Sequence, residues 1–98
     1  MKNIVIVANV KVKDGFKDEV YSELLKLHEA THKYDEGCIQ YDLHKNLDDE
    51  NSFTFVETWQ NANLLEEHMK KEHFLQFAQS VDGKLENLDI QKLEKVNL

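Results

Sequence analysis

The residues best suited to chemistry lie in one stretch, residues 57–74, where a strand-like segment changes into a helical one. This stretch contains Glu57, the only tryptophan of the chain, Trp59, and two of the five histidines, His68 and His73. A neutral imidazole can accept a proton near physiological pH, and an inward-facing carboxylate can orient the imidazole or act as the base itself. Polar and aromatic groups that converge where a strand meets a helix often line a pocket. We therefore predict that this stretch forms the wall of a small-molecule pocket.

The spacing of the histidines does not by itself predict a metal centre. His68 and His73 are five residues apart, which would place their rings about 140° apart on a straight helix at ~100° per residue. Only a break near Lys71 would let both rings approach the pocket. His28 and His32 have a spacing that suits a metal, but no third ligand follows at a recognisable interval. We therefore predict no metal site.

Hydrophobic periodicity predicts the elements that position this pocket wall. In the last strand Leu93 falls out of phase with its apolar neighbours, which favours a β-bulge near Gln91 or Lys92. Alternating residues predict strands at 3–12, 38–45, 52–59 and 84–96, and helical spacing predicts helices at 16–33, at 61–70 and over a further segment with Phe74, Phe77, Ala78 and Val81.

The order of these elements is β-α-β-β-α-β, which predicts an α+β fold of the ferredoxin-like type in a single domain, residues 1–98. Such a fold has a four-stranded antiparallel sheet with helices on one face. Alternation places Ile39, Tyr41 and Leu43 on one face of their strand, and Val5 and Val7 on the sheet face that no helix would cover. An exposed apolar face is unfavourable on a monomer, so we expect a homodimer that packs through its sheet faces.

Composition excludes several classes of function. The net charge is −7 and all twelve basic residues are lysine, so the chain lacks the positive footprint of a nucleic-acid-binding protein. A single cysteine, Cys38, allows no intrachain disulfide and fits a reducing compartment. No apolar run approaches the ~18 residues of a membrane span, and the first residues do not form a signal peptide. We therefore expect a cytoplasmic protein without a membrane or nucleic-acid partner.

Motifs along nearly the whole chain resemble the antibiotic biosynthesis monooxygenase domain, in its quinol monooxygenase-like branch. The matching features are Ala8-Asn9 before Asp14-Gly15, Glu36-Gly37-Cys38 with Tyr41-Asp42-Leu43, Phe53 with Glu57 and Trp59, Leu65-Glu66-Glu67-His68, and His73-Phe74. The resemblance implies a dimeric ferredoxin-like α/β barrel with a pocket between sheet and helices. It also implies that O₂ oxidises a hydroquinone or a similar polyphenol without flavin, haem or metal.

For that expected reaction, the residues themselves suggest roles within the site. A neutral histidine would take a proton from a substrate hydroxyl, which leaves an electron-rich phenolate that O₂ can oxidise. Two aromatic side chains would flank the ring, and an amide would hold one of its oxygens. The predicted catalytic residues are His68, Glu57 and His73, and the predicted substrate-binding residues are Asn9, Trp59, Phe74 and Tyr41.

Other functions remain open at this point. The same histidine and carboxylate could shuttle protons in an isomerase of a small oxygen-rich metabolite, although the absence of arginine weakens this for phosphorylated substrates. A stress-related protein that only binds a metabolite is a third hypothesis. Haem degradation is disfavoured, because the haem-degrading relatives carry their tryptophan where this chain has His68 and their axial histidine near Ala78.

Overall fold

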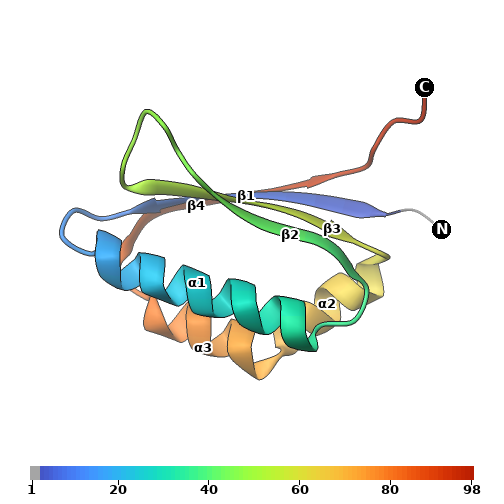
Figure 1. The fold of residues 1–98 in the computed structure, drawn as a ribbon, viewed down its shortest axis with the longest axis horizontal. Coiled ribbons are helices and arrows are strands. Elements are labelled where there is room, and N and C mark those ends of the chain that lie inside the picture. The colour runs from blue at the N-terminus through green and yellow to red at the C-terminus, as the bar shows by residue number, and fades with distance from the viewer. Residues whose placement is uncertain (1–2) are drawn as a thin grey trace.

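The computed structural model describes residues 3–98, so the first two residues of the predicted domain lie outside the described part (Figure 1). The predicted order of elements is confirmed, with the second helical region divided into two helices. The elements are β1 (Ile4–Val12), α1 (Lys17–Tyr34), β2 (Cys38–Lys45), β3 (Ser52–Trp59), α2 (Ala62–Lys70), α3 (Glu72–Ser80) and β4 (Leu85–Leu93).

The four strands form one antiparallel sheet in the order β2-β3-β1-β4. All three helices lie on one face of this sheet, as Figure 1 shows. This arrangement confirms the predicted ferredoxin-like fold. None of the helices in the described part of the chain is long and apolar enough to cross a membrane.

The core lies between the inner face of the sheet and the helices. Strand β3 shows strict alternation, with Phe53, Phe55, Glu57 and Trp59 buried and the residues between them partly exposed. This is the period of a strand with one covered face. Helix α1 contributes a buried stripe at helical spacing, which consists of Val20, Leu24, Leu27 and Thr31.

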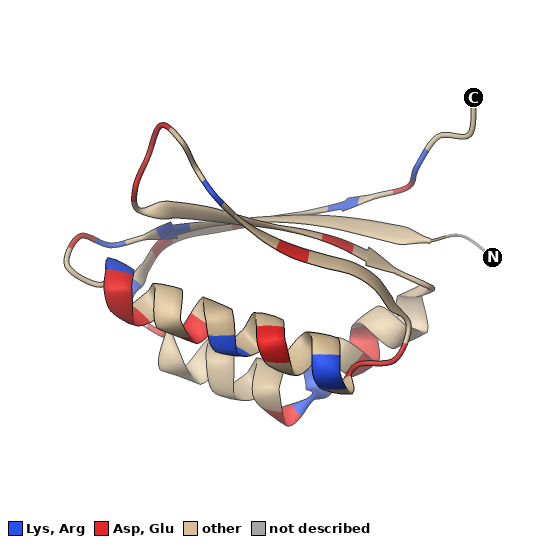
Figure 2. Ribbon diagram, viewed as in Figure 1, with Lys and Arg blue, Asp and Glu red and all other residues tan. Residues whose placement is uncertain are grey.

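No helix covers the outer face of the sheet within residues 3–98 (Figure 1). Val5 pairs with Thr58, Val7 with Val56, and Asn9 with Thr54 across β1 and β3. Val5, Val7 and Val56 are partly exposed and Asn9 is exposed. Figure 2 shows acidic and basic residues along α1 and in the turns that connect the elements.

The observed strand pairing differs at two places from the alternation that the sequence predicts. Val5 pairs directly with Leu93, so the bulge predicted near Gln91 or Lys92 is wrong. The register shifts instead at the other end of the strand, where Lys11 pairs with Asn87 and Val12 with Leu85. Leu93 is out of phase because it lies on the outer face beside Val5, whereas Leu88 and Ile90 line the inner cavity. The strand also ends at Leu93, three residues earlier than predicted.

A second shift lies in β2. Cys38 pairs with Trp59 but Gln40 pairs with Thr58, so Ile39 is an extra residue. Ile39 is therefore 59% exposed, rather than sharing a face with Tyr41 as simple alternation would require.

Candidate active site

The helical stretch breaks at Lys71. Asn61 caps the N-terminus of α2 by accepting a hydrogen bond from the backbone N–H of Leu64 (2.9 Å). Lys71 is extended, with φ −67° and ψ 149°, and its backbone N–H donates to the carbonyl of His68 at 3.2 Å. Helix α3 then starts in a new direction, so the rings of His68 and His73 converge to 6.2 Å between centroids. The sequence indicated that both rings could converge only if the helix broke near Lys71, and the structure has this break.

Both histidines converge on Asp35, which follows the last residue of α1. The Asp35 carboxylate binds Nδ1 of His68 through a short hydrogen bond, and its Oδ2 lies 3.2 Å from Nε2 of His73. The side chains of Asp35 and His68 are each 2% exposed. A carboxylate only accepts hydrogen bonds, so Nδ1 of His68 carries the proton in this pair. In the neutral ring Nε2 is then a free acceptor, which is the state that a general base needs.

Electrostatics favour that neutral ring. Burial lowers the pKa of His68 below its ordinary value, and the hydrogen bond and negative charge of Asp35 oppose this shift only in part. His68 therefore holds a basic nitrogen at neutral pH rather than an imidazolium.

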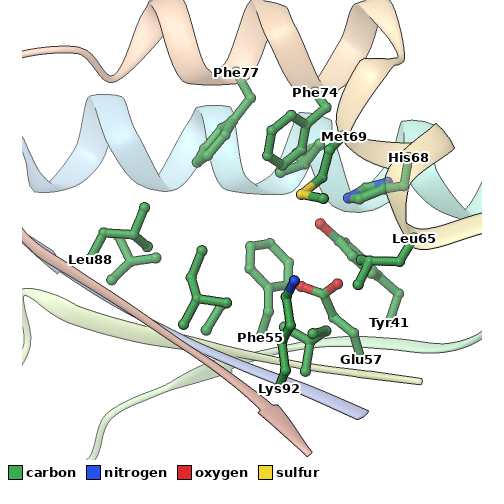
Figure 3. A pocket seen from close by; sticks show the side chains of 15 residues that line it. Tyr41, Phe55, Glu57, Leu65, His68, Met69, Phe74, Phe77, Leu88 and Lys92 are labelled. Carbon is green, nitrogen blue, oxygen red and sulfur yellow. The ribbon is translucent and has the colours of Figure 1, made fainter. Parts of the chain in front are cut away.

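A cavity of about 90 Å³ lies between the inner face of the sheet and helices α2 and α3 (Figure 3). Fifteen residues line it, and all but four of them are apolar. The four are Tyr41, Glu57, His68 and Lys92. A cavity needs ~10–15 Å³ of this volume for each water molecule, so this one has room for about six waters or more. One small ring would occupy a comparable space. The site thus combines an apolar enclosure with a few polar groups, as small-molecule sites do.

Glu57 is an unusual carboxyl group in this cavity. It is 6% exposed, and its Oε1 accepts a hydrogen bond from Nε1 of Trp59 at 2.9 Å. Burial raises the pKa of Glu57 to about 7, even though the Trp59 hydrogen bond acts in the opposite direction. Glu57 is therefore close to half protonated at neutral pH and can donate a hydrogen bond as well as accept one. Figure 3 shows the Lys92 side chain directed toward this carboxyl group.

Aromatic rings fix His68 from several sides. The ring of Trp59 lies 4.6 Å from His68 between centroids, and those of Phe74 and Tyr41 lie at 5.1 and 5.4 Å with edge-on geometry. Burial raises the pKa of Tyr41 above its ordinary value, so its hydroxyl stays protonated and can donate a hydrogen bond. Phe74 and Tyr41 line the cavity, whereas Trp59 is fully buried behind His68 and does not.

The structure brings together four of the seven predicted site residues in the cavity: Tyr41, Glu57, His68 and Phe74. The other three lie elsewhere. Trp59 supports Glu57 and His68 from behind, and His73 contacts Asp35 without lining the cavity. Asn9 lies on the outer face of the sheet, where its Oδ1 accepts a hydrogen bond from the Thr54 hydroxyl at 2.7 Å. Asn9 therefore cannot hold a substrate oxygen in this cavity.

Two residues of the site, Asp35 and Lys92, were not predicted. Asp35 is 33 residues from His68, and no local pattern marks it beyond its place before a turn. Lys92 had a usable signal, because alternation places it on the same face of β4 as Leu88 and Ile90, which also line the cavity.

Comparison with known proteins shows similarity over most of the chain. The model of the family described as antibiotic biosynthesis monooxygenase matches residues 3–80. An uncharacterised protein of Synechocystis sp. is 32% identical over 76 residues, which is 78% of this chain and 51% of the relative. This chain thus spans about half the length of that relative. The Bacillus subtilis protein named putative monooxygenase YcnE is 34% identical over 76% of this chain and 78% of its own length.

Solved structures share the fold. PA3566 from Pseudomonas aeruginosa superimposes with a TM-score of 0.91 at 30% identity, over 99% of this chain and 97% of its own. A Caulobacter crescentus protein, described as a putative antibiotic biosynthesis monooxygenase, gives a TM-score of 0.90 at 21% identity, over 98% of this chain and 92% of its own. At that identity the second likeness supports the fold alone.

Proposed function

The chain belongs to the antibiotic biosynthesis monooxygenase family, and from this membership we propose that it is a monooxygenase that oxidises a hydroquinone or a similar polyphenol with O₂, without a cofactor. The observation that carries the proposal is the Asp35–His68 pair, which presents a free imidazole nitrogen at the wall of an apolar cavity. Such a pair supplies a positioned general base, typically worth about 10²–10⁴-fold in rate.

In the proposed reaction Nε2 of His68 takes a proton from one ring hydroxyl. The resulting phenolate is electron-rich and transfers electrons to O₂, and a carbon–oxygen bond forms at the ring. Loss of water from the adduct breaks the O–O bond. One hydroquinone and one O₂ then give one hydroxyquinone and one water. The ring is oxidised by four electrons in total and O₂ accepts all four, so the reaction needs no external reductant.

The remaining polar groups of the cavity would orient the ring. The Tyr41 hydroxyl and the protonated form of Glu57 can donate hydrogen bonds to the substrate oxygens, and Phe74 gives the ring an aromatic wall. The apolar lining strengthens these interactions because it excludes water. The volume of about 90 Å³ favours a single ring over a fused-ring substrate.

We also propose that the protein works as a homodimer through the outer face of the sheet. Val5, Val7 and Val56 are only partly covered there within one chain. A second copy that packs its own sheet on this face would remove the apolar surface from water, which is the main driving force for association.

Oxygen uptake with a panel of single-ring and fused-ring hydroquinones tests the proposed activity, with autoxidation subtracted. Uptake should saturate with a single-ring substrate and fall by about 10²-fold or more in His68→Gln. His28→Gln serves as the matched control, because His28 lies on α1 and does not line the cavity. No uptake above the uncatalysed rate for any hydroquinone would refute the proposed function.

A further inference from the structure

Three metal-ligand atoms converge on the side of His68 that faces away from the cavity. One ligand atom from each of Asp35, His68 and His73 lies within 4.8 Å of the other two. The nitrogens that contact the Asp35 carboxylate are Nδ1 of His68 and Nε2 of His73. In a tetrahedral zinc site with bonds of about 2.0–2.1 Å, the ligand atoms are ~3.4 Å apart. Oδ1 of Asp35 and Nε2 of His73 already lie 3.1 Å apart, and the short Asp35–His68 contact would have to open for an ion to bind. We propose that Asp35, His68 and His73 bind a divalent transition-metal ion of the zinc class, and that a bound ion suppresses the proposed oxygenase.

The Asp35 carboxylate has capacity for a further partner. Its side chain is 2% exposed, and its Oδ1 accepts no hydrogen bond from residues 3–98, although it lies 3.1 Å from Nε2 of His73. A buried polar oxygen without a hydrogen bond is unfavourable, and a cation is one group that would satisfy it. Both histidine rings already direct a nitrogen at this carboxylate, so the three ligands are preorganised.

The three ligands also come from three different elements. Asp35 follows α1, His68 lies near the end of α2, and His73 lies in the first turn of α3, after the break at Lys71. The convergence therefore depends on tertiary structure rather than on local sequence, and a bound ion would tie the three helices together. His73 is the most accessible ligand at 17% exposed, so it can adjust to the ion.

A polar cleft borders two of the three ligands, Asp35 and His68. The cleft has a volume of about 240 Å³ and is lined by Tyr34, Asp35, Glu36, Leu64, Glu67, His68 and Lys71. Glu36 and Glu67 favour a cation there, and Lys71 opposes it. Two imidazoles and one carboxylate, with one position left for water, form the ligand set of many open zinc sites. Mg²⁺ and Ca²⁺ prefer oxygen ligands throughout, so the site should discriminate against them.

The second part of the proposal rests on the proposed function. A neutral imidazole that binds a metal through Nδ1 must carry its single proton on Nε2. Nε2 of His68 is the atom that would accept the substrate proton. An ion in the Asp35 cluster would therefore convert the base into a hydrogen-bond donor and stop proton removal, although it never enters the cavity.

Calorimetric titration of the full chain with Zn²⁺, and visible absorption with Co²⁺, test the binding. One ion per chain should bind, and Co²⁺ should give the intense visible bands of a four-coordinate site. His73→Gln and Asp35→Asn should each weaken binding by at least about tenfold, whereas His28→Gln should leave it unchanged. If Asp35→Asn does not fold, as judged by circular dichroism, His73→Gln alone decides. The absence of one-to-one binding, or binding that His73→Gln does not weaken, would overturn the site.

Oxygen uptake at increasing Zn²⁺ tests the coupling, since Zn²⁺ has no redox chemistry of its own. Uptake should fall as the site fills, return on addition of a chelator, and require at least about tenfold more Zn²⁺ for half-inhibition in His73→Gln. If zinc binds but the metal-free protein oxidises no quinol, the proposed function is refuted and the proposed metal site is not. If quinol oxidation continues unchanged with zinc bound, the proposed inhibition by the ion is refuted.

Discussion

Asp35 determines which nitrogen of His68 faces the cavity. Asp35→Asn keeps the size of the side chain, but the amide can donate to Nδ1 of His68 and so place the imidazole proton on Nε2. We expect quinol oxidation to lose about 10²-fold or more in kcat with a smaller change in KM, because the base and not the cavity is affected. Steady-state oxygen uptake measures both constants.

Glu67→Gln provides the control for Asp35→Asn, since it removes a nearby carboxylate that does not contact His68 through a hydrogen bond among the described residues. Equal losses in the two variants would mean that negative charge near the cluster matters, rather than the orientation of His68.

Glu57 should make the stability of the protein fall as pH rises. Its pKa is about 7 in the folded state against an ordinary value of 4.5. The folded state therefore holds more protons than the unfolded state between these values, and unfolding becomes easier as the pH increases through that window. The contribution of the protonated Glu57 to the free energy of unfolding is fully present below the pKa of the unfolded state, and it is lost as the pH rises through about 7.

Glu57→Gln removes this titration while its amide oxygen can still accept the Trp59 hydrogen bond. We would measure the free energy of unfolding of both proteins in urea at pH 5 and at pH 8. The value for the variant minus the value for the wild type should be about 2–3 kcal/mol larger at pH 8 than at pH 5. Other titrating groups cancel in this comparison. A difference between the two proteins that does not vary with pH would contradict a raised pKa at Glu57.

At the level of single residues, the sequence predicted the direction of side chains whose orientation follows from their position within one strand or helix. Glu57 lies in phase with Phe53 and Trp59, and His68 lies one turn after Leu64 and Leu65, so phase alone directs both side chains inward. Asp35 has no such signal, because only the packing of α1 against α3, and of α3 against α2, brings it to His68. Asn9 shows the opposite case. Its phase with Val5 and Val7 already placed it on the outer face, and the predicted role in holding a substrate oxygen was inconsistent with that phase.

At the level of elements, the turn before β2 is tightly packed against α2. Gly37 has φ +75°, and a Cβ built on it would lie 2.2 Å from Cδ1 of Leu64. Gly37→Ala therefore carries both the cost of a left-handed backbone, about 1–2 kcal/mol, and the cost of overpacking, about 1–3 kcal/mol. We expect a loss of about 2–5 kcal/mol in the free energy of unfolding, measured by urea denaturation.

Gly83 offers a matched control for Gly37. Gly83 has φ +78°, but a Cβ there would meet no atom within 4 Å. Gly83→Ala should therefore carry the backbone cost alone, and the difference between the two variants should isolate the contact with Leu64. Equal losses would show that Leu64 moves aside freely and that the turn does not fix α2.

The same contrast between local and tertiary causes explains which elements were predictable. The boundaries of α1 and β3 follow from residues within each segment, so periodicity located them to within about a residue. The break at Lys71 was predicted only as a condition, since the two histidines cannot converge on one straight helix. The pairing shifts at Ile39 and near Glu86 were not predicted, because a bulge is a relation between two strands and leaves little trace in either one.

At the level of the whole molecule, the outer face of the sheet leaves a small apolar cluster partly exposed among polar residues, namely Val5, Val7, Val56 and Leu93. Val7 lies near its centre and pairs with Val56 on β3. A charge at this position costs little in a monomer, because the side chain is already partly exposed there. In a homodimer that packs through this face, the charge would be buried without a partner, which is strongly unfavourable.

Val7→Asp should therefore convert a dimer into a monomer with little change in fold. Sedimentation equilibrium should give twice the chain mass of 11.5 kDa for the wild type and the single mass for the variant, while circular dichroism stays the same. Leu25→Asp is the control, because Leu25 is 45% exposed on α1, on the opposite side of the sheet. A monomeric wild type, or a dimer that only Leu25→Asp disrupts, would show that the outer face is not the interface.

Because each copy carries a net charge of −7, the two copies repel each other. The affinity of the dimer should therefore increase as salt screens this repulsion.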